Sequence, residues 1–265
     1  MSYSSAPIGI FDSGVGGLSI ARAIRALLPG EMIHYVADQQ YNPYGEQEKS
    51  TIEGRSMKVV EFLMEQGCKS IVVACNTATV NAVDRLRDRY DVPIVGVEPG
   101  IKPAAERTRT GVVGVLATRQ TLASQSYNGL KKRVASDVCL LERACPDFVS
   151  LVERGHLCGD DTREAVERYV GPLLDAGVDQ IVLGCTHFSF LAPEISKFCG
   201  DGVEMIDTAS PVANELLRRI NDDVAENPAQ MPGDLCCWRS KVSALDDSVI
   251  RELWGQEISV ETILL

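Results

Sequence analysis

Two short segments from opposite halves of the chain follow almost the same residue pattern. Residues 71–77 read Ile-Val-Val-Ala-Cys-Asn-Thr, and residues 181–187 read Ile-Val-Leu-Gly-Cys-Thr-His. In each segment an apolar run ends at a small residue and a cysteine, and polar residues that can start a helix follow. The pattern predicts two matching strand ends, each carrying a thiol, at Cys75 and Cys185.

Apolar runs alternate with segments of helical periodicity through the first part of the chain. We expect buried strands at residues 8–11, 33–36, 70–74 and 94–97, and helices at residues 18–28, 50–66 and 78–90. This alternation is typical of parallel βαβ units, in which helices cover the faces of the sheet.

A second series of the same kind follows the first. We expect strands at residues 111–117, 137–141, 180–184 and 203–206, and helices at residues 120–133, 147–154, 161–176 and 211–220. Pro146 suits the start of one of these helices. Residues 8–13 resemble residues 113–118, and the cysteine segments come third in both series. We infer a degenerate internal repeat.

The repeat predicts an α/β fold with two similar lobes, whose mainly parallel sheets are flanked by helices and related by an approximate two-fold axis. We expect residues 1–98 and 210–265 in the first lobe and residues 99–209 in the second, with the active site in the cleft between them. The Pro99-Gly100 pair marks a turn at the crossing point.

The last part of the chain gives a weaker pattern. We expect a loop at residues 221–234, followed by a strand at 235–239, a helix at 246–254 and a strand at 258–263. This tail is expected to pack back on the first lobe.

Charge and cysteine content exclude several classes of function. The net charge of −11 over 265 residues argues against a general nucleic-acid or membrane-surface binder. No apolar run approaches the roughly 18 residues of a membrane span. Nine cysteines, without a recognisable secretory signal at the start, predict free thiols in a reducing cytoplasm. Three scattered histidines and no Cys-x-x-Cys pair predict no metal site.

Polar residues gather where the predicted strands end. Because ligands of parallel α/β sheets bind beyond the carboxyl ends of the strands, we expect these side chains to converge on one cleft. They are Asp12, Ser13, Cys75, Asn76, Thr77, Thr118, Cys185, Thr186 and His187.

The two cysteines have two interpretations. Each can be a small buried apolar residue, which is the common use of cysteine in a core. Their matching positions favour a functional interpretation instead. A helix N-terminus beside each thiol is expected to lower its pKa from about 8.5, as acid–base work near neutral pH requires.

Residues 12–17 form a Gly-rich turn between a strand and a helix. The turn can cradle an anion with backbone N–H groups, or it can simply need glycine for a tight bend. It fits neither the phosphate-binding loop with its lysine nor the dinucleotide fingerprint, so nucleotide binding is disfavoured.

Two charged residues have two interpretations each, and a third is ambiguous. His187 would share the face of Cys185 on an extended strand and tune its proton, or it would cap the next helix. Asp12 would assist Cys75 from a neighbouring strand end, or it would cap the Gly-rich helix. Glu153 lies on a predicted helix, where a glutamate is usually solvated.

Further hydroxyl groups surround the predicted cleft. Tyr44, in the Asn42-Pro43-Tyr44-Gly45 turn, can point its hydroxyl into the cleft or pack over the turn. Thr118 and Thr121 can bind a carboxylate or cap a helix.

Several segments together resemble the cofactor-independent aspartate/glutamate racemase family. They occur in family order between residues 9 and 187: Gly9 to Leu18, Pro43-Tyr44-Gly45, Ala74-Cys75-Asn76-Thr77-Ala78, Gly96-Val97-Glu98-Pro99, Lys102-Pro103-Ala104, Gly114-Val115-Leu116-Ala117-Thr118 and Gly184-Cys185-Thr186-His187. The combination is specific, although no single segment is.

The resemblance implies an isomerase that interconverts L- and D-glutamate without a cofactor and supplies D-glutamate for peptidoglycan. It implies that Cys75 and Cys185 are the acid–base residues and that Asp12, His187 and Glu153 help them. Substrate contacts are implied at Asp12, Ser13, Tyr44, Gly45, Asn76, Thr77, Thr118, Thr121, Thr186 and His187. A homodimer is compatible with such folds.

Two departures and three alternatives accompany the resemblance. Phe188-Ser189 stands where the family often has an aromatic residue and proline, and the tail matches loosely. The alternatives are an aspartate racemase or a related amino-acid racemase of the same family, a ligand-binding protein that has lost catalysis, and a metal-dependent hydrolase using Cys185 and His187. The presence of both cysteines and the shortage of histidines argue against the last two.

Overall fold

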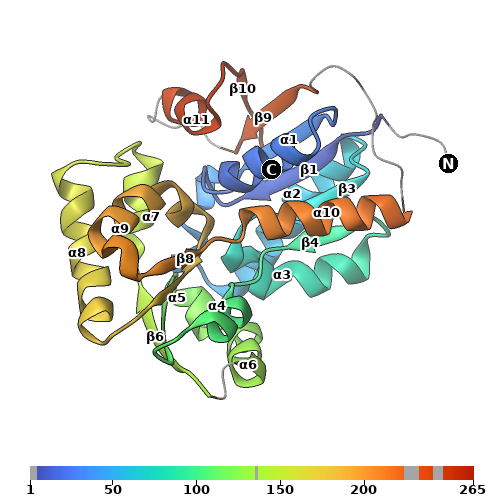
Figure 1. Cartoon of the computed structure of the whole chain (residues 1–265). Helices are drawn as coiled ribbons and strands as arrows, with labels where there is room; N and C mark the ends of the chain where they lie inside the picture. Colours follow the sequence, from blue (N-terminus) through green and yellow to red (C-terminus); the bar gives the residue numbers. More distant parts are fainter. Residues whose placement is uncertain (1–4, 135–136, 224–232, 241–246) are drawn as a thin grey trace.

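The computed structural model describes residues 5–134, 137–223, 233–240 and 247–265, and it consists of two α/β halves packed side by side (Figure 1). Each half is built on one parallel sheet. The predicted α/β class with two similar sheets is therefore confirmed.

The first sheet has six strands in the order β10-β9-β2-β1-β3-β4. All of its pairings are parallel, and the side chains of β1, β2 and β3 are buried along their full length. The strands are β1 (Ile8–Asp12), β2 (Ile33–Ala37), β3 (Ser70–Val73), β4 (Ile94–Gly96), β9 (Leu235–Arg239) and β10 (Val260–Thr262).

The second sheet has four parallel strands in the order β6-β5-β7-β8. They are β5 (Val112–Ala117), β6 (Cys139–Ala144), β7 (Gln180–Gly184) and β8 (Glu204–Ile206). This order repeats β2-β1-β3-β4 of the first sheet, so β3 and β7 occupy the same place in their sheets. The internal repeat inferred from the cysteine segments is present in the topology.

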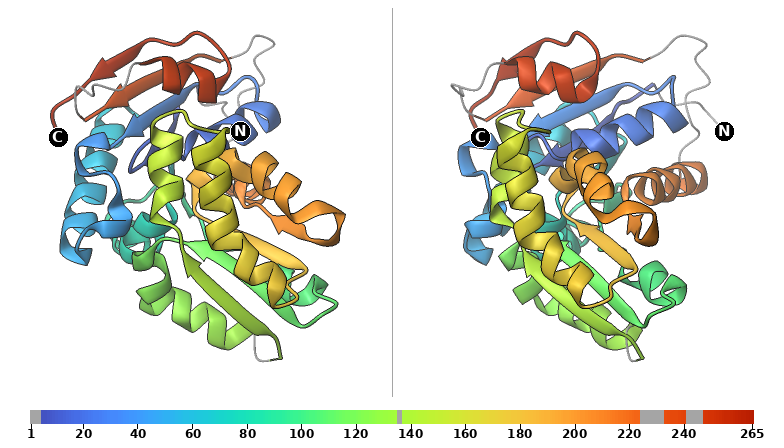
Figure 2. Two further views of the ribbon diagram at one scale, coloured as in Figure 1. Left: turned by 90° about the vertical axis from the view of Figure 1, so that its left-hand side faces the viewer. Right: turned by 60° about the vertical axis from the view of Figure 1, so that its left-hand side comes forward.

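Helices cover both sheets on both faces (Figure 2). In the first half, α1 and α10 pack on one face and α2 and α3 on the other; in the second half, α7, α8 and α9 oppose α4 and α6. The helices are α1 (Leu18–Leu27), α2 (Lys49–Glu65), α3 (Asn76–Arg89), α4 (Ile101–Arg107), α5 (Arg119–Ala123), α6 (Gln125–Val134), α7 (Pro146–Glu153), α8 (Asp160–Asp175), α9 (Ala192–Cys199), α10 (Ala209–Asp223) and α11 (Asp247–Trp254). Short 3-10 helices are η1 (Gln39–Tyr41), η2 (Tyr44–Glu46), η3 (Thr186–Leu191) and η4 (Gly200–Gly202).

One apolar cluster extends through both halves. It joins Ile20 and Ile24 of α1 to Phe148 of α7 and Phe188 of η3, and all four side chains are fully buried. Phe148 and Phe188 meet edge to face with ring centroids 5.2 Å apart. The boundary between the halves is therefore packed core on this side.

Some element boundaries differ from the sequence prediction. The strand expected at residues 137–141 runs from Cys139 to Ala144, because it stays in register with β5 as far as the Ala117–Ala144 pair. The sequence prediction ended the strand too early because Glu142 and Arg143 are polar. Strand β6 lies at the edge of its sheet, where a strand need not be apolar on both faces. The helix expected at residues 120–133 is broken at Ser124.

Several helices were not predicted from the sequence. The short helix α4 was missed, as were η3 and α9, which follow β7 without an intervening loop. The predicted helix at residues 211–220 is longer, extending from Ala209 to Asp223. Most of the loop expected at residues 221–234 lies outside the described residues.

The tail packs on the first sheet, as expected. Strand β9 pairs with β2 from Leu235 opposite Ile33 to Arg239 opposite Ala37, and β10 pairs with β9. The first residue of the helix expected at 246–254 lies outside the described part.

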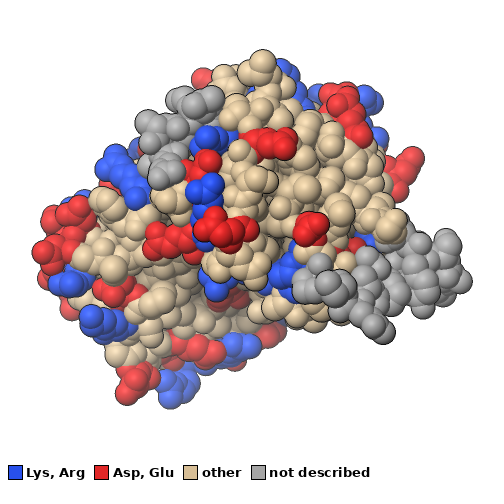
Figure 3. All heavy atoms as spheres, turned by 90° about the horizontal axis from the view of Figure 1, so that it is seen from above, with Lys and Arg blue, Asp and Glu red and all other residues tan. Residues whose placement is uncertain are grey.

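Two properties of the whole molecule follow from these elements. In the described part of the chain, no helix is both long and apolar enough to cross a membrane. On the face shown in Figure 3, the described Lys and Arg side chains are interspersed with Asp and Glu.

Candidate active site

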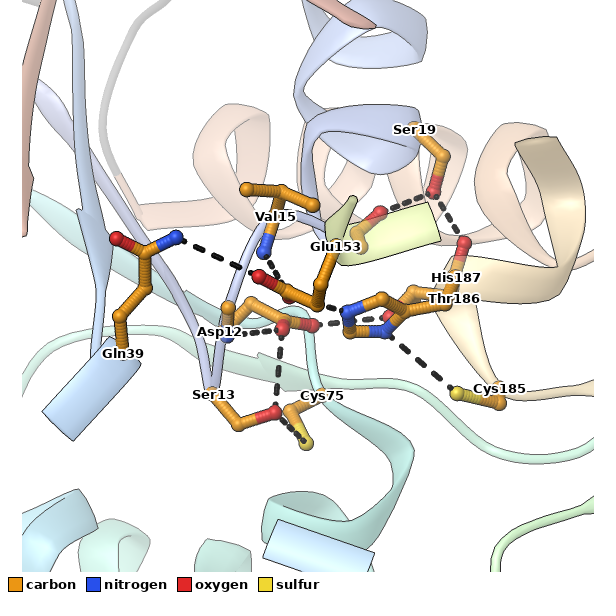
Figure 4. A network of polar contacts seen from close by, with 12 residues as sticks. Asp12, Ser13, Val15, Ser19, Gln39, Cys75, Glu153, Cys185, Thr186 and His187 are labelled. Carbon is orange, nitrogen blue, oxygen red and sulfur yellow. Dashed lines mark hydrogen bonds and ion pairs between the residues drawn. The ribbon is translucent and has the colours of Figure 1, made fainter. Parts of the chain in front are cut away.

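The carboxyl ends of the central strands bring together the residues that the sequence singled out. Asp12 ends β1, Cys75 follows β3, Thr118 follows β5 and Cys185 follows β7. Figure 4 shows Cys75 and Cys185 on two sides of a network that also contains Asp12, Ser13, Glu153, Thr186 and His187. One thiol comes from each sheet, at the equivalent strand.

Cys75 occupies the N-cap position of α3. The backbone N–H of Ala78 donates to its Sγ at 3.4 Å, and the thiol donates to Ser13 Oγ at 3.8 Å. Burial and the charge of Asp12 raise the pKa of this thiol to about 12. The expectation that the helix N-terminus would lower the pKa is therefore wrong for Cys75, because desolvation outweighs one N–H donor.

Cys185 has a different neighbour. Its Sγ lies 3.8 Å from Nδ1 of His187, and both residues are buried. His187 does not continue the strand, as the sequence prediction assumed, but lies in the first turn of η3. The 3-10 turn brings the imidazole to the thiol that precedes it by two residues.

His187 and Glu153 form a buried ion pair. Nε2 of His187 lies 2.7 Å from Oε1 of Glu153, with side chains 3% and 9% exposed. Burial alone would lower the pKa of His187, but the hydrogen bonds to Cys185 and Glu153 raise it well above 6.5. Burial would raise the pKa of Glu153, but His187 and the N–H of Val15 bring it below 4.5. Glu153 is thus not a solvated helix residue.

The Gly-rich turn holds carboxylates of the protein itself. The N–H of Gly14 donates to Asp12 Oδ1 at 2.7 Å, and the N–H of Val15 donates to Glu153 Oε1 at 2.9 Å. Gln39 Nε2 adds a contact to Glu153 Oε2 at 3.4 Å. These two N–H groups of the turn therefore bind carboxylates of the protein itself, and binding of a substrate anion by the turn stays a prediction.

Asp12 contacts the residues that neighbour both thiols, Ser13 beside Cys75 and Thr186 after Cys185. Its Oδ2 accepts from the hydroxyl of Thr186 at 2.9 Å, and its Oδ1 accepts from Ser13 at 3.4 Å. Complete burial raises its pKa above 3.8, although the charge of His187 opposes the shift. Asp12 reaches Cys75 through Ser13, and it does not cap α1, whose N-cap is Gly17.

Three threonine hydroxyls meet across the boundary between the halves. Thr77 of α3 lies 2.9 Å from Thr118 and 3.3 Å from Thr121, and the latter two are 3.0 Å apart. Thr118 also accepts from the N–H of Thr121 at 3.2 Å, so it caps α5 as well. The helix-capping interpretation of Thr118 therefore fits the structure, and its carboxylate-binding interpretation stays a prediction.

Three other predicted contact residues lie in η2 and at the start of α3. The Tyr44 hydroxyl donates to Asp38 Oδ2 at 2.5 Å, so it is held by the protein. A Cβ on Gly45 would lie 2.8 Å from Cβ of Thr118, which shows how closely η2 approaches α5. Asn76 donates to Val97 O at 3.4 Å, and its buried Oδ1 has no hydrogen-bond partner among the described residues.

The sequence reasoning missed three residues of this region: Gln39, Asp38 and Arg55. Asp38 follows β2 as Asp12 ends β1, so the strand-end rule applied to β2 would have found it. Arg55 lies within α2 and Gln39 in a short 3-10 turn, where no local pattern marks them.

His187 packs directly against Gly16. A Cβ at residue 16 would overlap the imidazole ring, so this position requires glycine. We expect Gly16→Ala to lower the free energy of unfolding by about 1–3 kcal/mol through overpacking. Gly54 on α2 has open space around it, and Gly54→Ala is expected to raise that free energy by about 0.5–1 kcal/mol. Urea unfolding measures both variants, and equal stabilities would contradict the packing argument.

Comparison with known proteins identifies a family model and several relatives that this chain matches. The Asp/Glu/Hydantoin racemase family model matches residues 18–216. A glutamate racemase of Ectopseudomonas mendocina (strain ymp) is 49% identical over 87% of this chain and 89% of its own. One from Pseudomonas putida (strain KT2440) is 44% identical over the full length of both chains.

A solved structure agrees with these relatives. The Escherichia coli glutamate racemase, in complex with L-glutamate and the activator UDP-MurNAc-Ala, superposes with a TM-score of 0.87 at 30% identity, over 98% of each chain. From the family model and these near-full-length relatives, we conclude that the chain belongs to the Asp/Glu/hydantoin racemase family.

Proposed function

We propose that this chain is an isomerase that interconverts L- and D-glutamate by two-base proton transfer, without a cofactor. The observation that carries the proposal is the pair of buried thiols, Cys75 and Cys185, at equivalent strand ends of two sheets. A racemase must work on both faces of one carbon, and each sheet supplies one thiol. The names of the full-length relatives support glutamate as the substrate.

The reaction balances within the two thiols and the substrate. One cysteine, as thiolate, takes the α-proton, so its S–H bond forms as the C–H bond breaks. The other cysteine, as thiol, gives its proton to the opposite face and becomes the thiolate. The reverse reaction starts from this exchanged state, so no external acid or base is consumed.

The bound substrate brings a positive charge to the reacting carbon itself. The pKa of Cys75 is raised to about 12 by burial and by Asp12, so this residue is a thiol at neutral pH in the free chain. The α-ammonium of glutamate is attached to the reacting carbon, and its positive charge favours the thiolate form. The buried Oδ1 of Asn76 is a suitable acceptor for ammonium hydrogens.

The surrounding hydroxyl groups suit the anionic groups of glutamate. Ser13, Thr77, Thr118, Thr121 and Thr186 line the strand ends with Tyr44 and Gly45 beside them, and donors of this kind stabilise charge that develops on the α-carboxylate. Residues 1–98 with 210–265, and residues 99–209, would act as two lobes that exclude water when they close.

The proposal has consequences for the cell. D-glutamate is a building block of peptidoglycan, so the chain would act in cell-wall synthesis and maintenance of cell shape. A cytoplasmic location is a prediction from the free cysteines. A homodimer is likewise a prediction, which light scattering of the purified chain would test.

The direct test follows optical activity from each pure enantiomer with chelator-treated protein and no added cofactor. We expect the circular dichroism signal to decay to zero from both L- and D-glutamate. Aspartate is measured in parallel, and faster turnover of aspartate would favour the alternative racemase. A signal that stays constant for both acids would contradict the proposal.

A further inference from the structure

A second buried ion pair lies in the first half of the molecule, at the carboxyl end of β2. Arg55 of α2 binds Asp38 through both Nε and Nη2, at 2.9 and 2.7 Å. Their side chains are 5% and 0% exposed. The guanidinium also donates to Leu265 O at 2.9 Å and lies 4.3 Å from the centre of the Tyr41 ring. Four contacts therefore fix one side chain that touches neither thiol.

The pair reaches the site through Tyr44. Asp38 Oδ2 accepts a hydrogen bond from the Tyr44 hydroxyl at 2.5 Å. The same oxygen accepts a hydrogen bond from Arg55 Nε. Burial and the charge of Asp38 raise the pKa of Tyr44 well above 10, so the phenol stays a donor. The position of η2 thus depends on a carboxylate that Arg55 orients.

The segment held in this way meets the second half of the molecule. Gly45 packs against Thr118, and Gln120 Nε2 of α5 donates to Gln47 O at 2.5 Å. A shift of residues 43–47 would open this boundary at Thr118, which belongs to the hydroxyl cluster with Thr77 and Thr121.

We propose that Arg55 is a positioning residue for the racemase site, acting through Asp38 and Tyr44 to hold residues 43–47 against Thr118. This role deepens the proposed function and rests on it. Because Arg55 contacts no proton-transferring group, it governs substrate binding and closure rather than the proton transfer itself.

The molecule contains a matched control for this pair. Lys69 and Glu31 form an ion pair 2.7 Å apart, with side chains 4% and 1% exposed. Glu31 precedes β2 and Lys69 precedes β3, so this pair lies at the amino ends of the strands, opposite the thiols. Arg55→Met and Lys69→Met each remove one buried cation from the same half, and both are expected to lower Tm.

The kinetic test compares the two variants in both directions of the reaction. We expect Arg55→Met to raise KM for glutamate about tenfold with kcat within about threefold of the parent. Lys69→Met is expected to leave KM unchanged. Arg55→Lys keeps the charge and loses the two-point contact, so its KM should fall between the parent and Arg55→Met. If Arg55→Met does not fold, Tyr44→Phe, which removes only the hydroxyl that binds Asp38, carries the same comparison.

A second readout does not depend on the reaction. Hydrogen exchange of the Glu46 and Gln47 amides, which donate to Pro43 O and Tyr44 O, should accelerate in Arg55→Met and not in Lys69→Met. Equal KM values in the two variants, a loss confined to kcat, or unchanged exchange in Arg55→Met would overturn the proposal. If the parent does not turn over glutamate, the proposed function fails separately, and exchange alone decides the positioning role.

Discussion

Replacing either Cys75 or Cys185 with alanine is expected to lower kcat/KM for glutamate racemisation by about 10²- to 10⁴-fold, the usual contribution of a positioned acid or base. Each enantiomer needs one thiolate to take its proton and one thiol to return a proton on the other face. Loss of either sulfur therefore blocks both directions. Circular dichroism of reactions started from pure L- and pure D-glutamate measures the loss.

Cys237 provides the control for this pair. It is 1% exposed in β9, which β2 and β1 separate from β3 in the first sheet, and its side chain is as small and apolar as the other two. Cys237→Ala removes one buried sulfur and is expected to keep near-parental turnover. If Cys75→Ala or Cys185→Ala behaved like Cys237→Ala, the two-base mechanism would be wrong.

Replacing Glu153 with glutamine is expected to lower kcat/KM by about 10- to 100-fold, the equivalent of one charge-assisted hydrogen bond of about 1.5–3 kcal/mol. The amide cannot stabilise the imidazolium of His187, and burial then lowers the His187 pKa from its raised value. The imidazole beside Cys185 becomes neutral at a lower pH. The pH profile of kcat/KM and the NMR titration of His187 should both shift in that direction.

The same pair sets a pH window for stability. The raised pKa of His187 adds to the free energy of unfolding. This contribution is fully present below pH 6.5, the ordinary pKa, and is lost as the pH rises through the pKa of the folded state. The lowered pKa of Glu153 also adds to the free energy of unfolding. This contribution is fully present above pH 4.5, the ordinary pKa, and is lost as the pH falls through the pKa of the folded state. The difference in free energy of unfolding between the parent and Glu153→Gln should be largest between pH 4.5 and pH 6.5, where both contributions are fully present.

Glu142 offers a control for this prediction. It lies on β6 and binds Lys131 at 2.7 Å and Tyr127 at 2.9 Å, away from both thiols. Glu142→Gln is expected to leave the His187 titration unchanged. An unchanged titration in Glu153→Gln would show that Glu153 does not control the protonation of His187.

The strand ends were predictable from the sequence because a small set of local rules identifies them. An apolar run that ends at an acidic residue, a threonine or a cysteine located Asp12, Cys75, Thr118 and Cys185, and parallel topology brought them together. The tail strand at Leu235–Arg239 was found by the same pattern.

Contacts between distant segments were not predictable from local patterns. Glu153 looked like a solvated helix residue, and only the family resemblance singled it out; its partner His187 lies on a separate 3-10 turn. Arg55 and Asp38 pair across α2 and the end of β2, which no periodicity encodes. The raised pKa of Cys75 also depends on burial within the assembled site.

The unequal neighbours of the two thiols have a thermodynamic consequence. Cys75 contacts the neutral hydroxyl of Ser13, whereas Cys185 contacts His187. Mirror-image amino acids have equal free energies in water, so the equilibrium constant of their interconversion is one. The ratio kcat/KM must then be identical for the two enantiomers, whatever surrounds each sulfur. Any advantage that the imidazole gives to kcat in one direction is accompanied by a KM larger by the same factor.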